Sequence, residues 1–181
     1  MTEKSAVIVV VEGYSDMVSI GTILKEYFSS TETQFVITRG DITSRDGVTP
    51  ANVITKLKTE IDTVRTKYGY QWKDLIRIIH IADTDGTFTK DCVVKADVKS
   101  IQYYEDHMES ANVEVTQQRN VNKAEVMFKL SSTNKINSTD YRLYFNSCNL
   151  EHVLHTTVMM STLPVRSPFP NSVPSTRSPP A

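Results

Sequence analysis

Two apolar segments of this 181-residue chain each run directly into acidic side chains. VIVVV leads into Glu12, and IIHIA leads into Asp83 and Asp85. Carboxylate oxygens are the hard ligands that Mg²⁺ and Mn²⁺ prefer, and two or three suffice because Mg²⁺ usually keeps several waters. If both segments are parallel strands of one sheet, their acids meet at its carboxyl edge, where open α/β sheets hold ligands. The spacing therefore predicts a divalent metal site suited to phosphoryl chemistry.

Strands are expected to alternate with helices along the part of the chain that must position these acids. Apolar runs predict four strands, at residues 6–11, 35–37, 75–82 and 141–145. Helical spacing also predicts helices. The first has Ser15 as its cap, and the second begins at Thr49 and Pro50. A third covers residues 112–130, and another begins near Leu150. Residues 87–111 give no clear pattern. Crossovers of this length join parallel neighbours, so we expect an α/β fold with a mostly parallel sheet of about four strands flanked by helices.

Length and composition limit the class of protein. Residues 1–155 are expected to form one domain, since a chain of 181 residues comfortably supports one core. Residues 156–181 hold six of the seven prolines and no acidic residue, which predicts a flexible Pro- and Ser-rich tail, either native or replacing a missing domain end. Neither a signal peptide nor an apolar run of roughly 20 residues is seen, so we expect a cytoplasmic protein without membrane contact.

A net charge of −1 gives no general attraction to nucleic acid, so a polyanion would have to be held locally, by metal ions and a few basic side chains. Arg39 follows the second expected strand at the same sheet edge, where it could act as a catalytic clamp on a phosphate. Arg119 and Lys123 share one face of the helix expected at residues 112–130. Either could also clamp a phosphate, but we favour solvated charges for both.

The acids also have structural interpretations. Asp85 precedes Gly86, and Asp-Gly is a common turn pair. Asp16 could equally be a metal ligand or a carboxylate that stabilises the first turn of a helix. Glu12 is harder to explain structurally, because it directly follows six apolar residues and Gly13 permits close approach of the backbone. We therefore favour the metal interpretation for Glu12 and for the aspartate pair.

These residue types and their order resemble the Toprim domain, the metal-dependent catalytic module of bacterial primases, topoisomerases, OLD-family nucleases and small ribonucleases. In that family a hydrophobic-EGxxD pattern ends the first strand, matched here by Glu12, Gly13 and Asp16. A DxD pair ends a later strand, matched by Asp83 and Asp85. The resemblance covers residues 5–88. It implies a Toprim-like, Rossmann-like fold, Mg²⁺ or Mn²⁺ as cofactor, and these four acids as metal ligands, with the glutamate also catalytic.

The segment NSCNLEHVLH, behind YRLYF, looks like the late acidic segment of RloB-like, defence-associated Toprim proteins. That resemblance makes Glu151 a further metal ligand. The proline and the aromatic residue that precede the acid in those proteins are absent here.

The leading hypothesis is a Mg²⁺-dependent nuclease that cleaves phosphodiesters in DNA or RNA, of the phage-defence or toxin kind. It implies a nucleic acid substrate and leaves room for a defence-system partner protein and for a homo-oligomer. A receiver-like or phosphatase-like domain that accepts a phosphoryl group on an aspartate beside Mg²⁺ is one alternative, although Glu12 stands where such domains carry an aspartate. A non-catalytic, truncated Toprim remnant that acts as a binding module is another.

Overall fold

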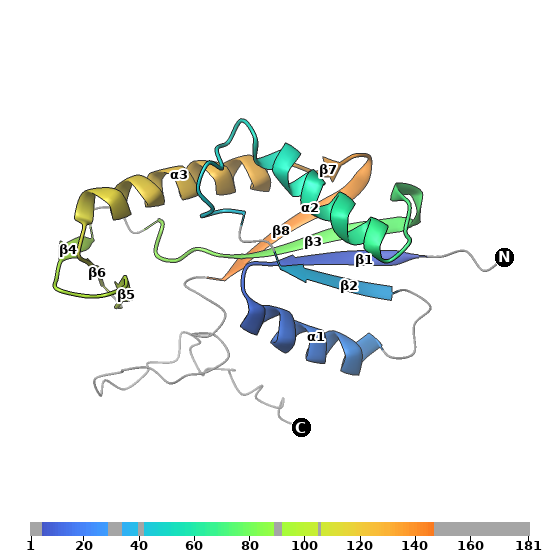
Figure 1. Ribbon diagram of the computed structural model, residues 1–181, viewed down its shortest axis with the longest axis horizontal. Helices are drawn as coiled ribbons and strands as arrows, with labels where there is room; N and C mark the ends of the chain where they lie inside the picture. The colour runs from blue at the N-terminus through green and yellow to red at the C-terminus, as the bar shows by residue number, and fades with distance from the viewer. Residues whose placement is uncertain (1–4, 29–33, 40–41, 89–91, 105, 147–181) are drawn as a thin grey trace, which may run out of the picture.

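The computed structural model describes residues 5–28, 34–39, 42–88, 92–104 and 106–146 (Figure 1). Its strands are β1 (Ala6–Val11), β2 (Gln34–Arg39), β3 (Leu75–Asp83), β4 (Val93–Lys95), β5 (Gln102–Tyr103), β6 (Met108–Ser110), β7 (Lys135–Ile136) and β8 (Thr139–Asn146). Its helices are α1 (Tyr14–Phe28), α2 (Val53–Lys67) and α3 (Val113–Ser131), with one 3-10 turn at Trp72–Asp74. The tail at 156–181 and the helix expected near Leu150 lie outside these residues.

The main sheet has the strand order β2-β1-β3-β8-β7. β2, β1, β3 and β8 are parallel, and β7 pairs with β8 in the antiparallel sense. The hairpin between β7 and β8 turns at Asn137 and Ser138, whose φ angles of 45° and 74° are those of a two-residue hairpin loop. The prediction of an α/β fold with a mostly parallel sheet is confirmed, with β7 as a fifth strand.

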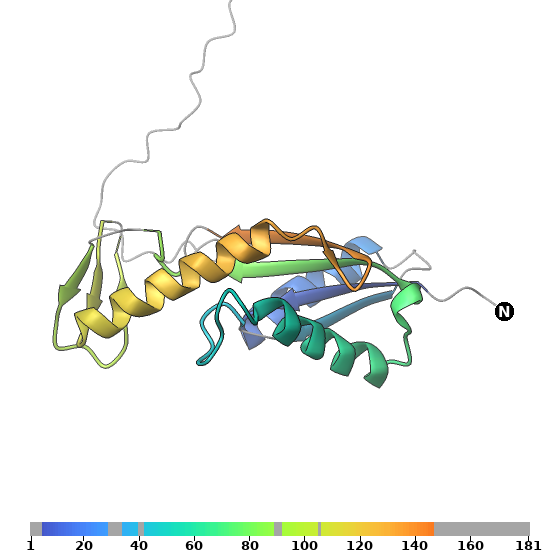
Figure 2. The same cartoon turned by 90° about the horizontal axis from the view of Figure 1, so that it is seen from above.

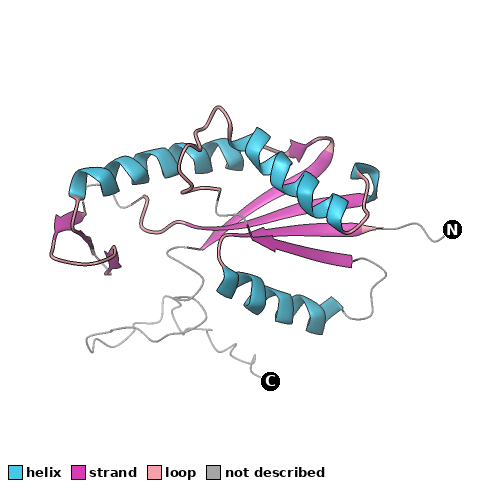
Figure 3. Cartoon of the chain, in the orientation of Figure 1, coloured by secondary structure: helices cyan, strands magenta, loops and turns pink. Residues whose placement is uncertain are grey.

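Helices cover both faces of this sheet (Figure 3). The alternation of side chains along β1 divides its residues between the two faces. On one face, Val7, Val9 and Val11 pack with apolar residues of α1. On the other face, alternate residues of β1 pack with α2 and α3; the buried side chains of that cluster include Ala6, Ile8, Val10, Val53, Leu57, Ile61, Val126 and Leu130. β1 is therefore buried on both sides, which explains its uninterrupted apolar sequence.

A second, small sheet with the order β4-β6-β5 lies beyond the carboxyl ends of the main strands. The first half of α3 extends past the main sheet and carries this small sheet (Figure 2). The strands of the small sheet are two or three residues long. Segments this short cannot show a periodicity, which is why residues 87–111 gave no pattern in the sequence.

The predicted start of α2 is wrong by three residues. Thr49 and Pro50 lie in a turn, and the N-cap of the helix is Asn52. The Asn52 side chain accepts a hydrogen bond from the Thr49 backbone N–H and donates one to the Gly47 carbonyl. An asparagine that ties down the preceding turn in this way moves the first helical residue to Val53.

Among the described residues, none of the helices has both the length and the apolar character that a membrane span requires.

His80 makes the stability of the fold depend on pH. Its side chain is fully buried in β3 and its Nδ1 lies 2.9 Å from the Tyr141 hydroxyl. Burial, and the charge of Lys123, lower the pKa of His80 to about 4. An unfolded histidine has a pKa of about 6.5, so the unfolded chain binds a proton that the folded chain excludes between these values.

The contribution of His80 to stability is therefore complete above pH 6.5 and is lost as the pH falls toward 4. We expect the free energy of unfolding to fall by about 2 kcal/mol from this group between pH 7 and pH 5. Urea unfolding of the wild type and of His80→Gln at both pH values checks this, because the variant should lack that part of the dependence. An identical dependence in both proteins would assign it to other groups.

Candidate site at the carboxyl edge of the sheet

The predicted acids come from neighbouring strand ends. Glu12 directly follows β1, Asp83 is the last residue of β3, and Asn146 is the last residue of β8. β1, β3 and β8 are adjacent and parallel, so these ends share one edge of the sheet. This edge faces the small sheet, and α3 spans the distance between the two sheets (Figure 1).

Asp16 reaches this edge from the start of α1. The helix begins at Tyr14, ahead of Ser15, so the prediction of Ser15 as the cap is wrong. Gly13 takes that place: its carbonyl accepts from the Met17 N–H at 3.3 Å, and its own N–H donates to Asp16 Oδ2 at 2.8 Å. This is the return half of a capping box, made by the third helical residue. One oxygen of Asp16 thus has a structural role, and its buried carboxylate lies near enough to Asp83 for its charge to raise the pKa of that carboxyl.

Glu12 is held on both of its carboxylate oxygens. The Thr43 hydroxyl donates to Oε1. The Lys123 ammonium lies 3.5 Å from Oε2. Thr43 is fully buried, as is Lys123, so this carboxylate is fixed in position by groups from α3 and from the loop that precedes α2.

Asp83 and Asp85 have different partners. Asp83 Oδ1 accepts from the Asn146 side chain at 2.9 Å, while Asp85 Oδ2 lies 2.7 Å from Lys123 Nζ. We expected the pair to point to one side, which requires extended backbone through Asp85. Instead, φ is 47° at Asp85 and 66° at Gly86, so the chain turns at once. The Asp-Gly turn is confirmed, and it directs the second carboxylate to α3.

Gly86 is required by this turn, because its φ lies in the left-handed region that side chains rarely adopt. We expect Gly86→Ala to lower the free energy of unfolding by about 1 kcal/mol, measured by urea unfolding. Gly86→Asn should lose less, since asparagine tolerates this backbone conformation. Equal losses in the two variants would show that the backbone angle is not the cause.

The sequence interpretation missed the burial of Lys123 and its ion pairs with the acids. We expected a solvated charge, but the side chain has no exposed surface and forms ion pairs with Asp85 and Glu12. It lies on the interior face of α3 with the polar side chains of Thr116 and Asn120. Full burial of a lysine requires such partners, since an isolated ammonium in the interior is strongly disfavoured.

Arg119 also departs from the expectation of a solvated charge. Its guanidinium is half-buried and donates to the Asp85 carbonyl at 3.3 Å and to the Tyr103 hydroxyl at 3.4 Å. It thereby ties the turn after β3 to the small sheet. The sequence showed that Arg119 and Lys123 share one face of the helix. It did not show that this face points into the molecule.

The electrostatic environment differs between the acids. Burial raises the pKa of the Asp83 carboxyl above its ordinary value, and the charges of Asp16 and Asp85 raise it further. The hydrogen bond from Asn146 and the charge of Lys123 act in the opposite direction. Glu12 and Asp85 each form an ion pair with Lys123. Asp16 and Asp83 form no ion pair with any of the described residues. An additional cation beside Asp83 would offset this unfavourable environment, whereas Glu12 and Asp85 already have a cationic partner.

The donors at this edge are carboxylates, which fit Mg²⁺ or Mn²⁺ by their chemistry. As they stand, no three acidic, histidine or cysteine side chains of the described residues are gathered into a ready metal cage. Mg²⁺ does not need one, since it is commonly bound through one or two carboxylates together with waters and substrate phosphates. The donor set is thus compatible with such an ion.

Two predicted site residues cannot be placed. Glu151 lies outside the described residues, and the side chain of Arg39 does too, although its backbone ends β2 beside β1. Their roles stay predictions.

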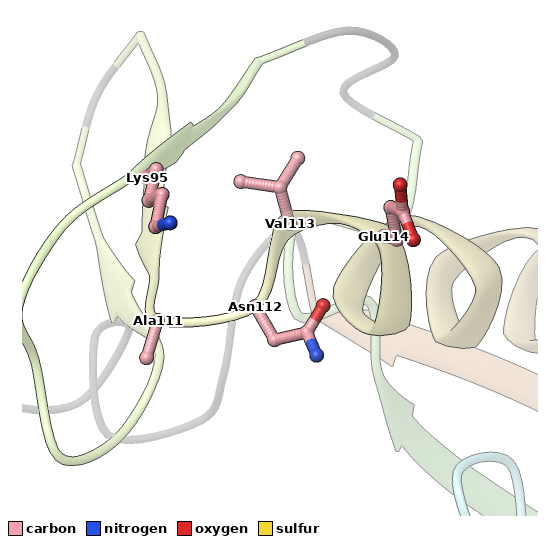
Figure 4. A pocket seen from close by; sticks show the side chains of 5 residues that line it. All are labelled: Lys95, Ala111, Asn112, Val113 and Glu114. Atoms are coloured by element: carbon pink, nitrogen blue, oxygen red, sulfur yellow. The ribbon is translucent and has the colours of Figure 1, made fainter.

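A shallow hollow lies at the start of α3, away from these acids. Lys95 of β4 and residues Ala111, Asn112, Val113 and Glu114 line it (Figure 4). No predicted site residue is among them, so the candidate site is the carboxyl edge and not this hollow.

Comparisons with known proteins found no matching family model, no matching curated protein and no matching solved structure.

Proposed function

We propose that this protein is a Mg²⁺- or Mn²⁺-dependent, Toprim-type nuclease that cleaves phosphodiester bonds in DNA or RNA. The observation that carries the proposal is the gathering of Glu12, Asp83 and Asp85, with Asp16, at the carboxyl edge of a parallel sheet around a buried lysine. Edges of this kind are where open α/β sheets hold ligands. Negative carboxylates alone would repel a phosphate, so a bound cation is required for a nucleic acid to approach them.

The roles follow from the environment of each acid. Asp83, with a second aspartate of this edge, would hold the ion, and the bound ion would supply charge neutralisation and activation of water. Glu12 would bind the ion or take the proton of the attacking water. Asn146 and Thr43 fix the carboxylates of Asp83 and Glu12 by hydrogen bonds. A defence or toxin role, with a partner protein, belongs to the same proposal.

The test is cleavage of single-stranded and double-stranded DNA and RNA by the purified protein, with Mg²⁺, with Mn²⁺ and with a chelator. Glu12→Gln and Asp83→Asn, shown to be folded by circular dichroism, are measured beside it. We expect metal-dependent cleavage that both substitutions lower on the order of 10²-fold or more. Equal cleavage by the wild type and both variants would contradict this site.

The alternative, acceptance of a phosphoryl group on an aspartate, is tested with the same preparations. Incubation with acetyl phosphate and Mg²⁺ followed by mass spectrometry of the intact chain detects the mass of one phosphoryl group. The nuclease proposal predicts no such adduct. An adduct lost in Asp83→Asn, without strand cleavage, would favour the alternative.

A further inference from the structure

Lys123 brings a fixed positive charge into the acidic edge. Its Nζ lies 2.7 Å from Asp85 and 3.5 Å from Glu12, which follow two adjacent parallel strands. An ammonium between two carboxylates has the position that a bridging divalent ion would have, with hard oxygens on both sides. α3 therefore supplies a cation from the chain itself.

This lysine is not free to leave. It has no exposed surface, and the helix that carries it is anchored by Val126 and Leu130, both fully buried in the main core. Glu12 is restrained as well, because the Thr43 hydroxyl holds its other oxygen. Coordination of a metal jointly by Glu12 and Asp85 would require this packed arrangement to break.

The other two acids of the edge are in a different situation. Among the described residues, Asp16 and Asp83 form no ion pair, and their known hydrogen bonds come from the Gly13 N–H and the Asn146 amide. Each of these bonds engages one carboxylate oxygen. Because neither carboxylate has a basic partner, an added cation is favoured beside these two groups.

We propose that Lys123 fills the cation position between Glu12 and Asp85, so that the edge binds a single divalent ion, through Asp16 and Asp83, in place of a pair of ions. The inference rests on the proposed function, which requires a metal at this edge, and it adds the number of ions and the two ligands. Lys123 is then a positioning residue, which acts through Glu12 and Asp85.

The test counts Mn²⁺ ions bound to the full chain, by isothermal titration calorimetry and by loss of the free Mn²⁺ signal in electron paramagnetic resonance. We expect one ion per wild-type chain. Asp16→Asn and Asp83→Asn should each weaken its binding by tenfold or more. Asp16→Asn keeps an oxygen for the Gly13 N–H, so the start of α1 should remain intact.

Lys123→Ala opens the position between Glu12 and Asp85 and should bind a second ion, detected as spin coupling between two Mn²⁺. Lys129→Ala, on an exposed position of the same helix, is the matched control and should bind one. If Lys123→Ala does not fold, the number of Mn²⁺ ions bound per wild-type chain still tests the inference.

Two ions on the wild type would overturn the inference and leave the proposed function standing. One ion that depends on Glu12 and not on Asp16 would also overturn it. No bound ion would overturn the inference and the metal-dependent function together.

Discussion

Replacement of Lys123 by methionine is expected to lower the free energy of unfolding by about 3 kcal/mol in the absence of divalent ions. Methionine retains most of the apolar stem but removes the charge that Glu12 and Asp85 share. Two carboxylates are then left close together and largely shielded from water, without a counter-charge. Urea unfolding monitored by circular dichroism, in a chelator, measures the loss.

Lys129→Met is the matched control for this prediction. It makes the same chemical change six residues further along α3, where the side chain is exposed. Exposed charges contribute little, so its effect should stay within about 0.5 kcal/mol. If Lys123→Met were no more destabilising than Lys129→Met, the ion pairs would not hold α3 to the edge.

Asp83→Asn is expected to lower metal-dependent cleavage on the order of 10²- to 10³-fold, because it removes a charged ligand and keeps the shape of the side chain. The same substitution should leave the fold as stable as before, or more stable. Burial and the neighbouring acids already oppose the ionised form of this group, and the amide oxygen can still accept the hydrogen bond from Asn146. Steady-state cleavage rates and thermal unfolding of one preparation measure both effects.

Asp140→Asn provides the control for charge loss on the sheet. Asp140 lies near the opposite end of β8, where it pairs with Arg77 at 2.8 Å. Its substitution should leave cleavage unchanged within about twofold, since surface ion pairs contribute little. A comparable loss of cleavage in both variants would show that the effect is not specific to the carboxyl edge.

The central strands could be predicted from the sequence, because strands that are buried on both faces read as unbroken apolar runs. β1 has the predicted bounds, and β3 is one residue longer than predicted. Their ends also located Glu12, Asp83 and Asp85 correctly at one edge of the sheet. The placement of acids after apolar strands thus predicted that these carboxylates share one edge of the sheet.

The burial of Lys123 could not be predicted, because the partners that make it tolerable lie 38 and 111 positions away in the chain. The apolar residues of α3 do not by themselves mark its buried face: Val121 and Phe128 are exposed, while the helix buries Thr116, Asn120 and Lys123. A helix that faces a polar site does not show the apolar periodicity of a helix that faces only a core.

Anomalous diffraction of Mn²⁺ in crystals of the full chain grown with that ion would locate the metal in the molecule. We expect an anomalous peak beside Asp83 at the carboxyl edge, with Lys123 still between Glu12 and Asp85. A peak that appears only elsewhere in the molecule, or no peak when the protein is saturated with Mn²⁺, would contradict it.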